Sequence, residues 1–294
     1  MSKSSQNEVT VLLNVWMFDD PLFLARSIQS VRNQLAVTVD LLIVADGPLS
    51  RDLSQVISDV EGYQDDNFSC RVIFEKEQRG LWHVRNRGLE ESKTDLVALH
   101  DADDVMHPNR LFKQLEYHRQ FECDVLGTSI VEFDPKTERL YGSRKALVDP
   151  IELLNAIKRV NPLAHSSVML RKSSVFKVGG YRDVYLAEDY DLWIRMAGSG
   201  FQLRNLEEQL VAFARNDTFF SRRGGYRFVK SEWQIQKTLV KSGQSSRLTS
   251  WIHFLERLAY RLAPASLRKL VHSRFLENSL NKDSPTHLLD FVRN

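Results

Sequence analysis

Three aspartates follow an apolar run in the stretch Leu96–Val105. The apolar run predicts a buried strand of an α/β sheet, and the aspartates are Asp101, Asp103 and Asp104. Like charges this close together cost free energy unless a positive group lies between them. A hard divalent cation prefers oxygen ligands, and one held by one or two carboxylates keeps positions open for a substrate phosphate. The sequence therefore predicts a cation and phosphate site at the carboxyl end of this strand.

The segments around the aspartates alternate between strand and helix patterns, which predicts an α/β fold with a mostly parallel sheet flanked by helices. The predicted strands are Val9–Trp16, Val39–Ala45, Cys70–Phe74, Asp95–Leu99, Asp124–Phe133, Arg139–Tyr141 and Ser167–Arg171. The predicted helices run from Pro21 to Leu35 and over Leu53–Val60, Gly80–Ser92, Pro108–Phe121, Ile151–Lys158 and Glu188–Ala197. From Tyr226 onward the pattern is helical.

Composition describes an ordinary globular chain of 294 residues, with 43% hydrophobic and 27% charged residues. Cys70 and Cys123 lack metal-ligand spacing, the N-terminus lacks a signal-peptide core, and no run reaches the ~18 apolar residues of a membrane span. We expect a cytoplasmic protein or one on the cytosolic face of a membrane. Charge divides the chain: residues 1–220 carry a net charge of −7 and residues 221–294 a net charge of +9. We interpret these segments as a catalytic domain and a basic helical region.

Taken in order, six segments of residues 9–215 resemble family 2 glycosyltransferases of the GT-A fold. These segments are Leu24–Gln34, Ile43–Pro48, Gly80–Gly88, Leu99–Leu111, Val178–Arg182 and Ala187–Arg195. The resemblance is strongest to bacterial enzymes that build O-antigen, capsule or exopolysaccharide repeat units. It implies a GT-A fold, here with a C-terminal helical extension.

The resemblance assigns Asp101-Ala102-Asp103 to the DXD motif of the family, where Mn²⁺ or Mg²⁺ bridges the protein and the diphosphate of a sugar nucleotide. It implies that Asp103 is the direct metal ligand and that Asp101 contacts the ribose or a metal-bound water, while Asp104 supports the geometry. A solvated acidic loop and a haloacid-dehalogenase-type site are the alternatives. An EF-hand is disfavoured, because Met106 stands where that loop needs glycine.

Three further residues correspond to donor-binding positions of the family. Asp46 matches the acid that hydrogen-bonds the nucleotide base, typically uracil, although Ala45 and Pro48 replace the usual Asp and Ser. The alternative for Asp46 is a plain turn residue. Arg85 and Asn86 match the arginine and asparagine near a helix N-terminus, where an anionic nucleotide is favoured. A solvated helix face is the alternative for Arg85.

Glu188 and Asp189 match the acidic pair that carries the catalytic base in many relatives. We assign Asp189 as the base that takes the proton of an acceptor hydroxyl, and Glu188 as a neighbour that orients the acceptor. Asp191 is the rival base, and the alternative for the pair is a favourable charge at a helix N-terminus. His165 and Trp193 are candidate acceptor contacts, with a structural histidine and core packing as their alternatives.

The basic region contains apolar stripes at helical spacing between residues 245 and 276. Basic amphipathic helices with aromatic residues lie in membrane interfaces, which would suit a lipid-linked acceptor on the inner leaflet. The alternative is packing on the catalytic domain or a second subunit, and nucleic-acid binding is disfavoured. Phe219–Arg227 is a candidate lid over the donor.

The resemblance, carried by these residues, implies an inverting, metal-dependent glycosyltransferase. Its expected donor is a nucleotide sugar, with UDP favoured, and its expected acceptor is a glycan hydroxyl on a polyprenyl diphosphate. A metal-dependent phosphatase or nucleotidyltransferase, and a non-catalytic membrane-associated protein on the same scaffold, are the alternatives.

Overall fold

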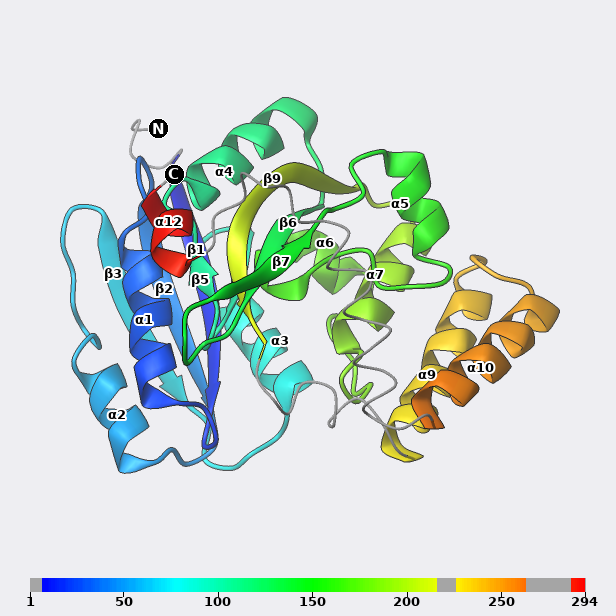
Figure 1. Ribbon diagram of the computed structural model, residues 1–294, viewed down its shortest axis with the longest axis horizontal. Coiled ribbons are helices and arrows are strands. Elements are labelled where there is room, and N and C mark those ends of the chain that lie inside the picture. Colours follow the sequence, from blue (N-terminus) through cyan, green and yellow to red (C-terminus); the bar gives the residue numbers. More distant parts are fainter. Residues whose placement is uncertain (1–6, 216–225, 263–286, 294) are drawn as a thin grey trace.

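The computed structural model describes residues 7–215, 226–262 and 287–293. A single twisted sheet of nine strands forms the centre, and helices cover both of its faces (Figure 1). The strands are β1 (Glu8–Trp16), β2 (Thr38–Asp46), β3 (Phe68–Phe74), β4 (Leu96–Asp101), β5 (Val105–Met106), β6 (Val125–Phe133), β7 (Leu140–Arg144), β8 (Met169–Arg171) and β9 (Leu203–Ala214). The helices flanking them are α1 (Pro21–Arg32), α2 (Arg51–Ser58), α3 (Leu81–Glu91), α4 (Arg110–Phe121), α5 (Pro150–Ala156), α6 (Lys172–Lys177) and α7 (Glu188–Gly198).

The first half of the sheet is parallel, in the order β3-β2-β1-β4. All four strands were predicted within a few residues of their ends, because each is an apolar run closed by polar or turn residues. In the β1 register, Trp16 lies beside Asp46 and Asn14 lies beside Asp101. The carboxyl ends of β2 and β4 therefore meet at one edge of the sheet.

The second half of the sheet is mixed, and its longest strand was missed. β8 pairs antiparallel with β4 and β6, while β9 runs parallel to β6 and pairs antiparallel with β5. The sequence pattern left β9 unassigned because Glu207 and Glu208 interrupt its apolar residues, and both are exposed at the register shift opposite Thr128 and Ser129. The predicted strand over Ser167–Arg171 is shorter than expected, since His165–Ser167 forms a 3-10 turn.

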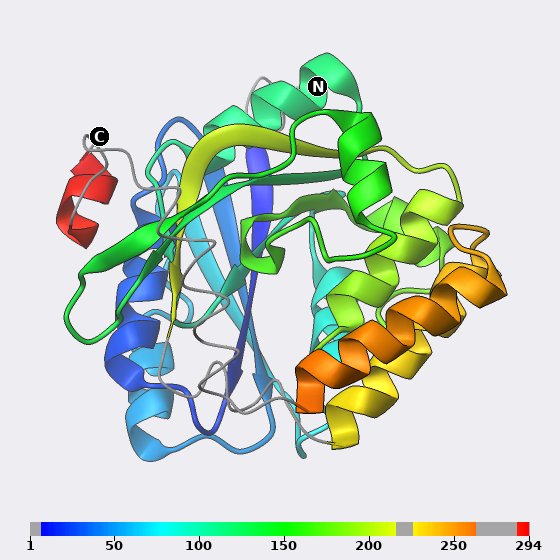
Figure 2. The same cartoon turned by 45° about the vertical axis from the view of Figure 1, so that its right-hand side comes forward.

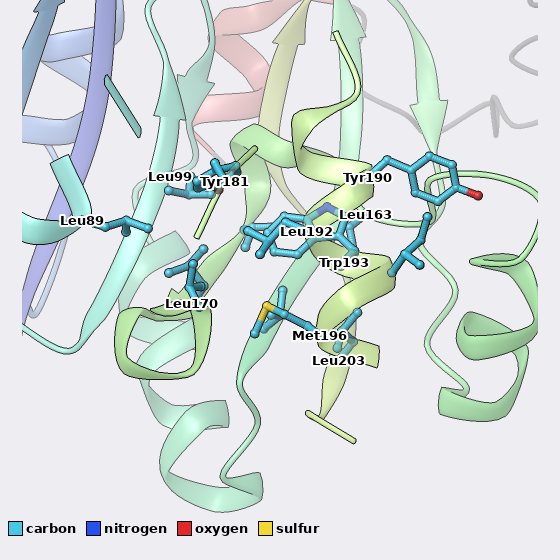
Figure 3. Close-up of a cluster of buried hydrophobic side chains, with 14 of the residues drawn as sticks. Leu89, Leu99, Leu163, Leu170, Tyr181, Tyr190, Leu192, Trp193, Met196 and Leu203 are labelled. Carbon is cyan, nitrogen blue, oxygen red and sulfur yellow. The ribbon is translucent and has the colours of Figure 1, made fainter. Parts of the chain in front are cut away.

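The strand alternation gives the sheet two cores. Val11 and Leu13 face α1 and α2, whereas Leu12 faces the cluster that contains α3 and α7. α3 approaches β1 closely at Gly88, where a Cβ would lie 2.2 Å from the Leu12 Cδ1 atom. Figure 3 shows part of the second cluster, with Leu99 of the sheet and Trp193 of α7. This packing fixes α3 and α7, which carry most of the predicted site.

The C-terminal helices pack on the rest of the chain. α9 (Tyr226–Lys241) and α10 (Arg247–Leu262) lie side by side, and α9 also contacts α7 (Figure 2). α12 (Leu288–Arg293) buries Leu288 and Phe291 against β6 and β9. In the described ranges, every helix is too short or too polar to cross a bilayer. Most of the predicted lid, Phe219–Arg227, and the part of the predicted apolar stripes beyond residue 262 lie outside the described residues.

Buried His118 makes stability depend on pH. It lies in α4 with its Nδ1 atom 3.0 Å from the Cys123 carbonyl oxygen, and burial lowers its pKa from 6.5 to about 4. The unfolded chain binds this proton at higher pH than the folded chain does. The contribution of His118 to folding stability is therefore fully present above pH 6.5 and is lost as the pH falls towards about 4.

We expect His118→Asn to flatten this pH dependence, because asparagine retains a donor for the Cys123 carbonyl but does not titrate. At roughly 1.4 kcal/mol per pKa unit, the wild-type loss across the window is of the order of 3 kcal/mol. Urea denaturation from pH 7 to pH 4 measures it. Buried His100, whose pKa is lowered to about 3 mainly by burial, contributes a parallel loss in both proteins. Identical pH dependence in the variant and the wild type would contradict the assignment.

Candidate active site

Asp46 at the end of β2 holds the entry to α3. Its Oδ1 atom accepts a hydrogen bond from the Arg79 N–H at 2.7 Å, and its Oδ2 atom accepts one from the Gly80 N–H at 3.1 Å. The adjacent Gly47 has φ +84° and approaches the Gln78 nitrogen so closely that a Cβ would lie 2.8 Å from it. Asp46 thus joins the β2 turn to the start of α3. Its predicted contact with a nucleotide base stays a prediction.

The three aspartates after β4 differ in burial. Asp101 and Asp103 are partly exposed at the sheet edge, whereas Asp104 is fully buried. The Asp104 Oδ1 atom accepts the Ala214 N–H at 2.7 Å, and its Oδ2 atom has no hydrogen-bond partner in the described part of the chain. Burial, with Asp103 and Asp101 nearby, raises the pKa of Asp104. Asp104 therefore ties the acidic turn to β9.

A buried polar network beneath these aspartates was not predicted. Fully buried Arg110 donates to the Leu99 carbonyl at 3.0 Å and to the Gln114 side chain at 3.1 Å. Gln114 donates in turn to the carbonyls of Leu126 and Ser167. Burial lowers the pKa of Arg110 to about 9, while Asp104 and Asp101 favour its charge. The network links β4, α4, β6 and the 3-10 turn. Its signal in the sequence is weak, since Arg110 is simply an arginine in the first turn of an amphipathic helix.

His165 faces the acidic turn from the other side. Its Nδ1 atom lies 3.8 Å from Asp101 Oδ1, and its Nε2 atom lies 3.2 Å from the Tyr181 hydroxyl. Burial would raise the pKa of Asp101, but His165 and Arg85 outweigh it and lower the pKa to about 2. His165 therefore lies at the site, next to a predicted metal-binding residue. Tyr181, which the sequence reasoning left without a role, completes this side.

Arg85 and Glu188 form a buried ion pair between α3 and α7. Arg85 Nη1 donates to Glu188 Oε1 at 2.6 Å, and the guanidinium lies over the Tyr181 ring at 5.6 Å. Burial opposes the charge of Arg85, but Glu188, Tyr181 and Asp101 together raise its pKa. The alternative of a solvated face for Arg85 is wrong, since both side chains are almost fully buried, and its predicted contact with a nucleotide stays a prediction.

Two predicted site residues, Asn86 and Glu188, form hydrogen bonds to other parts of the chain. Asn86 donates to the Tyr181 carbonyl at 2.9 Å and accepts the Tyr181 N–H at 2.8 Å, so its amide holds the loop that carries Tyr181. A Cβ on Gly180 would lie 2.6 Å from the Asn86 Oδ1 atom, which explains the glycine there. Glu188 is buried and its Oε1 atom accepts a hydrogen bond from Arg85, while its predicted role in orienting an acceptor stays a prediction.

Asp189 and Asp191 point in different directions, as expected from their i, i+2 spacing. Asp189 is partly exposed, and its Oδ2 atom accepts the Asn161 Nδ2 donor at 2.7 Å. Asp191 is buried, pairs with Arg195 at 2.8 Å and accepts the Thr238 hydroxyl of α9 at 2.6 Å. The arrangement favours Asp189 over Asp191 as a base, and sequence reasoning missed Asn161.

Trp193 lies in the core, not in a pocket. Its side chain is fully buried among Leu163, Leu192 and Met196 (Figure 3). An acceptor cannot reach it, so the expected acceptor contact is corrected to the packing role. The physical reason is that the Trp193 side chain packs into the buried cluster that contains Leu163, Val125 and Leu203.

The acidic turn offers a partial set of metal ligands. Across residues 7–215, 226–262 and 287–293, no group of three or more His, Cys, Asp or Glu side chains is arranged to hold a metal ion. Asp101 and Asp103 at an open sheet edge fit instead a cation that shares its ligands with a phosphate. The unpartnered Asp104 oxygen behind them fits the same interpretation.

The sequence matches a known protein family. The family model described as Glycosyl transferase family 2 matches residues 15–180. The chain is 26% identical over 276 residues to the UDP-Gal:alpha-D-GlcNAc-diphosphoundecaprenol beta-1,3-galactosyltransferase of Escherichia coli, with 92% of this chain and 97% of that protein covered. Other relatives are glycosyltransferases of amylovoran and O-antigen biosynthesis.

Solved structures share the fold. The S. aureus TarS 1-349 complex with UDP-GlcNAc superposes with a TM-score of 0.63 at 12% identity, covering 86% of this chain and 72% of that chain. The mannosyltransferase PcManGT of Pyrobaculum calidifontis, in complex with GDP-Man and Mn2+, gives a TM-score of 0.56 at 12% identity, covering 97% of this chain and 83% of that chain. The expected GT-A fold is confirmed.

We expect Arg85→Met to lower the free energy of unfolding by about 3–5 kcal/mol, because it leaves Glu188 buried without a partner. Arg85→Met combined with Glu188→Gln should recover part of this loss. Arg87→Met is the matched control, since Arg87 pairs with Glu91 on the exposed side of the same helix, where such pairs contribute about 0–1 kcal/mol. Chemical denaturation measures all four proteins, and equal losses for Arg85→Met and Arg87→Met would contradict the role of burial.

Proposed function

The chain belongs to glycosyl transferase family 2, and on that premise we propose that it transfers a sugar from a UDP-sugar to a hydroxyl of a polyprenyl-diphosphate-linked glycan. The E. coli relative named above uses a UDP-sugar and a diphosphoundecaprenol-linked acceptor, and the TarS structure holds UDP-GlcNAc. The family and its bacterial polysaccharide relatives are established. The donor, the acceptor and the stereochemical course are our proposal.

One observation supports this proposal more than any other. The short segment from Asn161 to His165 lies against both Asp189 and Asp101, the candidate carboxylates of the acceptor and donor sides. Asn161 contacts Asp189, and His165, four residues later, lies 3.8 Å from Asp101. The Arg85–Glu188 pair joins α3, next to Asp46, to α7, which carries Asp189. A donor phosphate near Asp101 and a hydroxyl near Asp189 would therefore occupy neighbouring parts of one site, as a displacement reaction requires.

On the donor side, Asp101 and Asp103 would hold a divalent cation, and Asp46 would lie towards the nucleotide base. When bound, the cation would offset the negative charge that develops on the leaving diphosphate. The Mn2+ in the PcManGT structure supports a divalent ion of this kind. Arg85 adds a fixed positive charge behind Asp101, and it is already neutralised in part by Glu188.

On the acceptor side, Asp189 acts as general base. The acceptor oxygen forms a bond to the anomeric carbon while the bond from that carbon to the diphosphate breaks, and the electron pair leaves with the nucleoside diphosphate. Asp189 takes the hydroxyl proton. One displacement inverts the anomeric centre, so an α-linked donor gives a β-linkage. The Asp189 Oδ2 atom already accepts a hydrogen bond from the Asn161 amide, and the Oδ1 atom accepts one from the Tyr190 N–H. Each oxygen has a second lone pair that can accept the hydroxyl proton.

We further propose that α10 rests on an anionic membrane surface. Leu248, Trp251, Ile252 and Leu255 form an apolar stripe at helical spacing, and these side chains are 50–73% exposed. The basic excess of residues 221–294 suits an anionic leaflet, and contact there would bring a lipid-linked acceptor to the enzyme at the cytosolic face. The rest of the predicted contact, up to residue 276, lies outside the described residues.

Transfer can be tested with UDP-galactose, UDP-glucose or UDP-GlcNAc as donor and a GlcNAc-diphosphoryl-lipid analogue as acceptor, in Mn²⁺. We expect one donor to give a β-linked product. Asp103→Ala and Asp189→Asn should each lower kcat by about 10²–10⁴-fold without unfolding the protein. Asp183→Asn, an exposed aspartate in the loop before α7, is the matched control and should stay within about twofold.

Two results would contradict this account. Near-normal transfer by Asp189→Asn would remove the base assignment. Release of phosphate from simple esters without any acceptor, and no transfer from any donor, would replace the transferase by a phosphatase.

Membrane contact can be tested by vesicle flotation with phosphatidylglycerol-containing and purely zwitterionic vesicles. We expect binding to the anionic vesicles, weakened by salt, and lost in the double variant Leu248→Ser with Leu255→Ser. Ile151→Ser with Leu154→Ser, two exposed aliphatic residues of α5, is the matched control. Equal flotation of both double variants, or a dimer in solution that only the α10 variant disrupts, would contradict membrane docking.

A further inference from the structure

We propose that Asn161 is a positioning residue that sets the direction of the Asp189 carboxylate for proton removal. This inference rests on the proposed function, because it takes Asp189 as the base. Asn161 is partly exposed in the loop after α5, on the same side as partly exposed Asp189. Its Nδ2 atom donates to Asp189 Oδ2 at 2.7 Å, in the range of strong hydrogen bonds to a carboxylate.

The direction of the Asn161 amide is fixed by its own loop. The Asn161 Oδ1 atom accepts the Leu163 N–H at 3.2 Å, which closes a turn around Pro162. If the amide flipped, its nitrogen would face the Leu163 donor and its oxygen would face the Asp189 carboxylate. Both contacts would then be unfavourable, so the amide presents its N–H₂ group to Asp189.

The loop itself is anchored in the core. Leu163 is 3% exposed and belongs to the cluster that contains Trp193 of α7. A Cβ on Gly127 would lie 2.8 Å from the Leu163 Cδ2 atom, so this contact with β6 is tight. Pro162 also restricts the backbone of Asn161 to extended conformations. Asn161 is therefore a rigid donor, of the kind that holds a reacting group in place.

The second Asp189 oxygen is held by its own helix. The Tyr190 N–H donates to Asp189 Oδ1 at 2.7 Å, and the Tyr190 hydroxyl donates to the Ile157 carbonyl at 2.7 Å near the end of α5. Without Asn161, the carboxylate would keep only this single contact and could rotate about its χ angles. Within the described residues, the ionisable groups around Asp189 include Arg85, Tyr181 and Tyr190, and Glu188 precedes it in α7.

The variant Asn161→Asp distinguishes the role of Asn161 in orienting Asp189 from its role in holding its own loop. The new side chain keeps an oxygen for the Leu163 N–H but loses the donor to Asp189. Two carboxyl groups at hydrogen-bond distance share a proton, so we expect the acidic limb of the kcat–pH profile to move to higher pH by about one unit or more. Asn161→Ala should lower kcat by about 10–100-fold with the KM for the donor unchanged, because the base loses its direction.

The matched control is Asn155→Ala, which removes an exposed asparagine of α5 whose side chain accepts a hydrogen bond from Lys158. UDP binding in Mn²⁺, followed by thermal shift, should be the same in all Asn161 variants and in the wild type. Asn161 variants that keep the wild-type kcat and pH profile, while Asp189→Asn is inactive, would overturn this inference alone. An active Asp189→Asn would overturn the base assignment and this inference with it.

Discussion

The buried ion pair between Arg85 and Glu188 is the interaction on which the site depends. It joins α3, whose entry is held by Asp46 of β2, to α7, whose second residue is the candidate base Asp189. Neither charge can be removed alone without leaving the other unpaired in a region closed to water. The pair therefore fixes how α3 and α7 lie relative to each other. Tyr181, held by Asn86 on α3, extends the same connection to His165 and Asp101.

The same electrostatic problem recurs at the acidic turn. Three aspartates within four residues would repel one another, and the fold places compensating groups on several sides of them. Arg110 lies beneath, His165 lies beside Asp101, and the Ala214 N–H reaches Asp104. Asp101 and Asp103 stay partly exposed at the open edge of the sheet. This is the arrangement that a phosphate-bound cation would complete.

The parallel half of the fold and the positions of the carboxylates could be predicted from the sequence, because apolar runs ending in acidic residues encode both. The partners of the side chains could not. Glu188 and Asp189 look equivalent in the sequence, yet Glu188 is buried against Arg85 and Asp189 is partly exposed beside Asn161. Those differences arise from contacts between residues 28 to 103 positions apart. β9 was missed for a related reason: two glutamates interrupt its apolar run at a register shift that only pairing with β6 reveals.

Binding of a nucleotide at the sheet edge tests the central claim most directly. Thermal unfolding should be measured with UDP, GDP, CMP and dTDP, each with and without Mn²⁺, on the wild type and on Asp103→Ala. The account predicts that UDP raises the unfolding temperature only when Mn²⁺ is present, and that Asp103→Ala abolishes this rise. No stabilisation by any nucleotide, or equal stabilisation without metal, would contradict a metal-dependent donor site at Asp101 and Asp103.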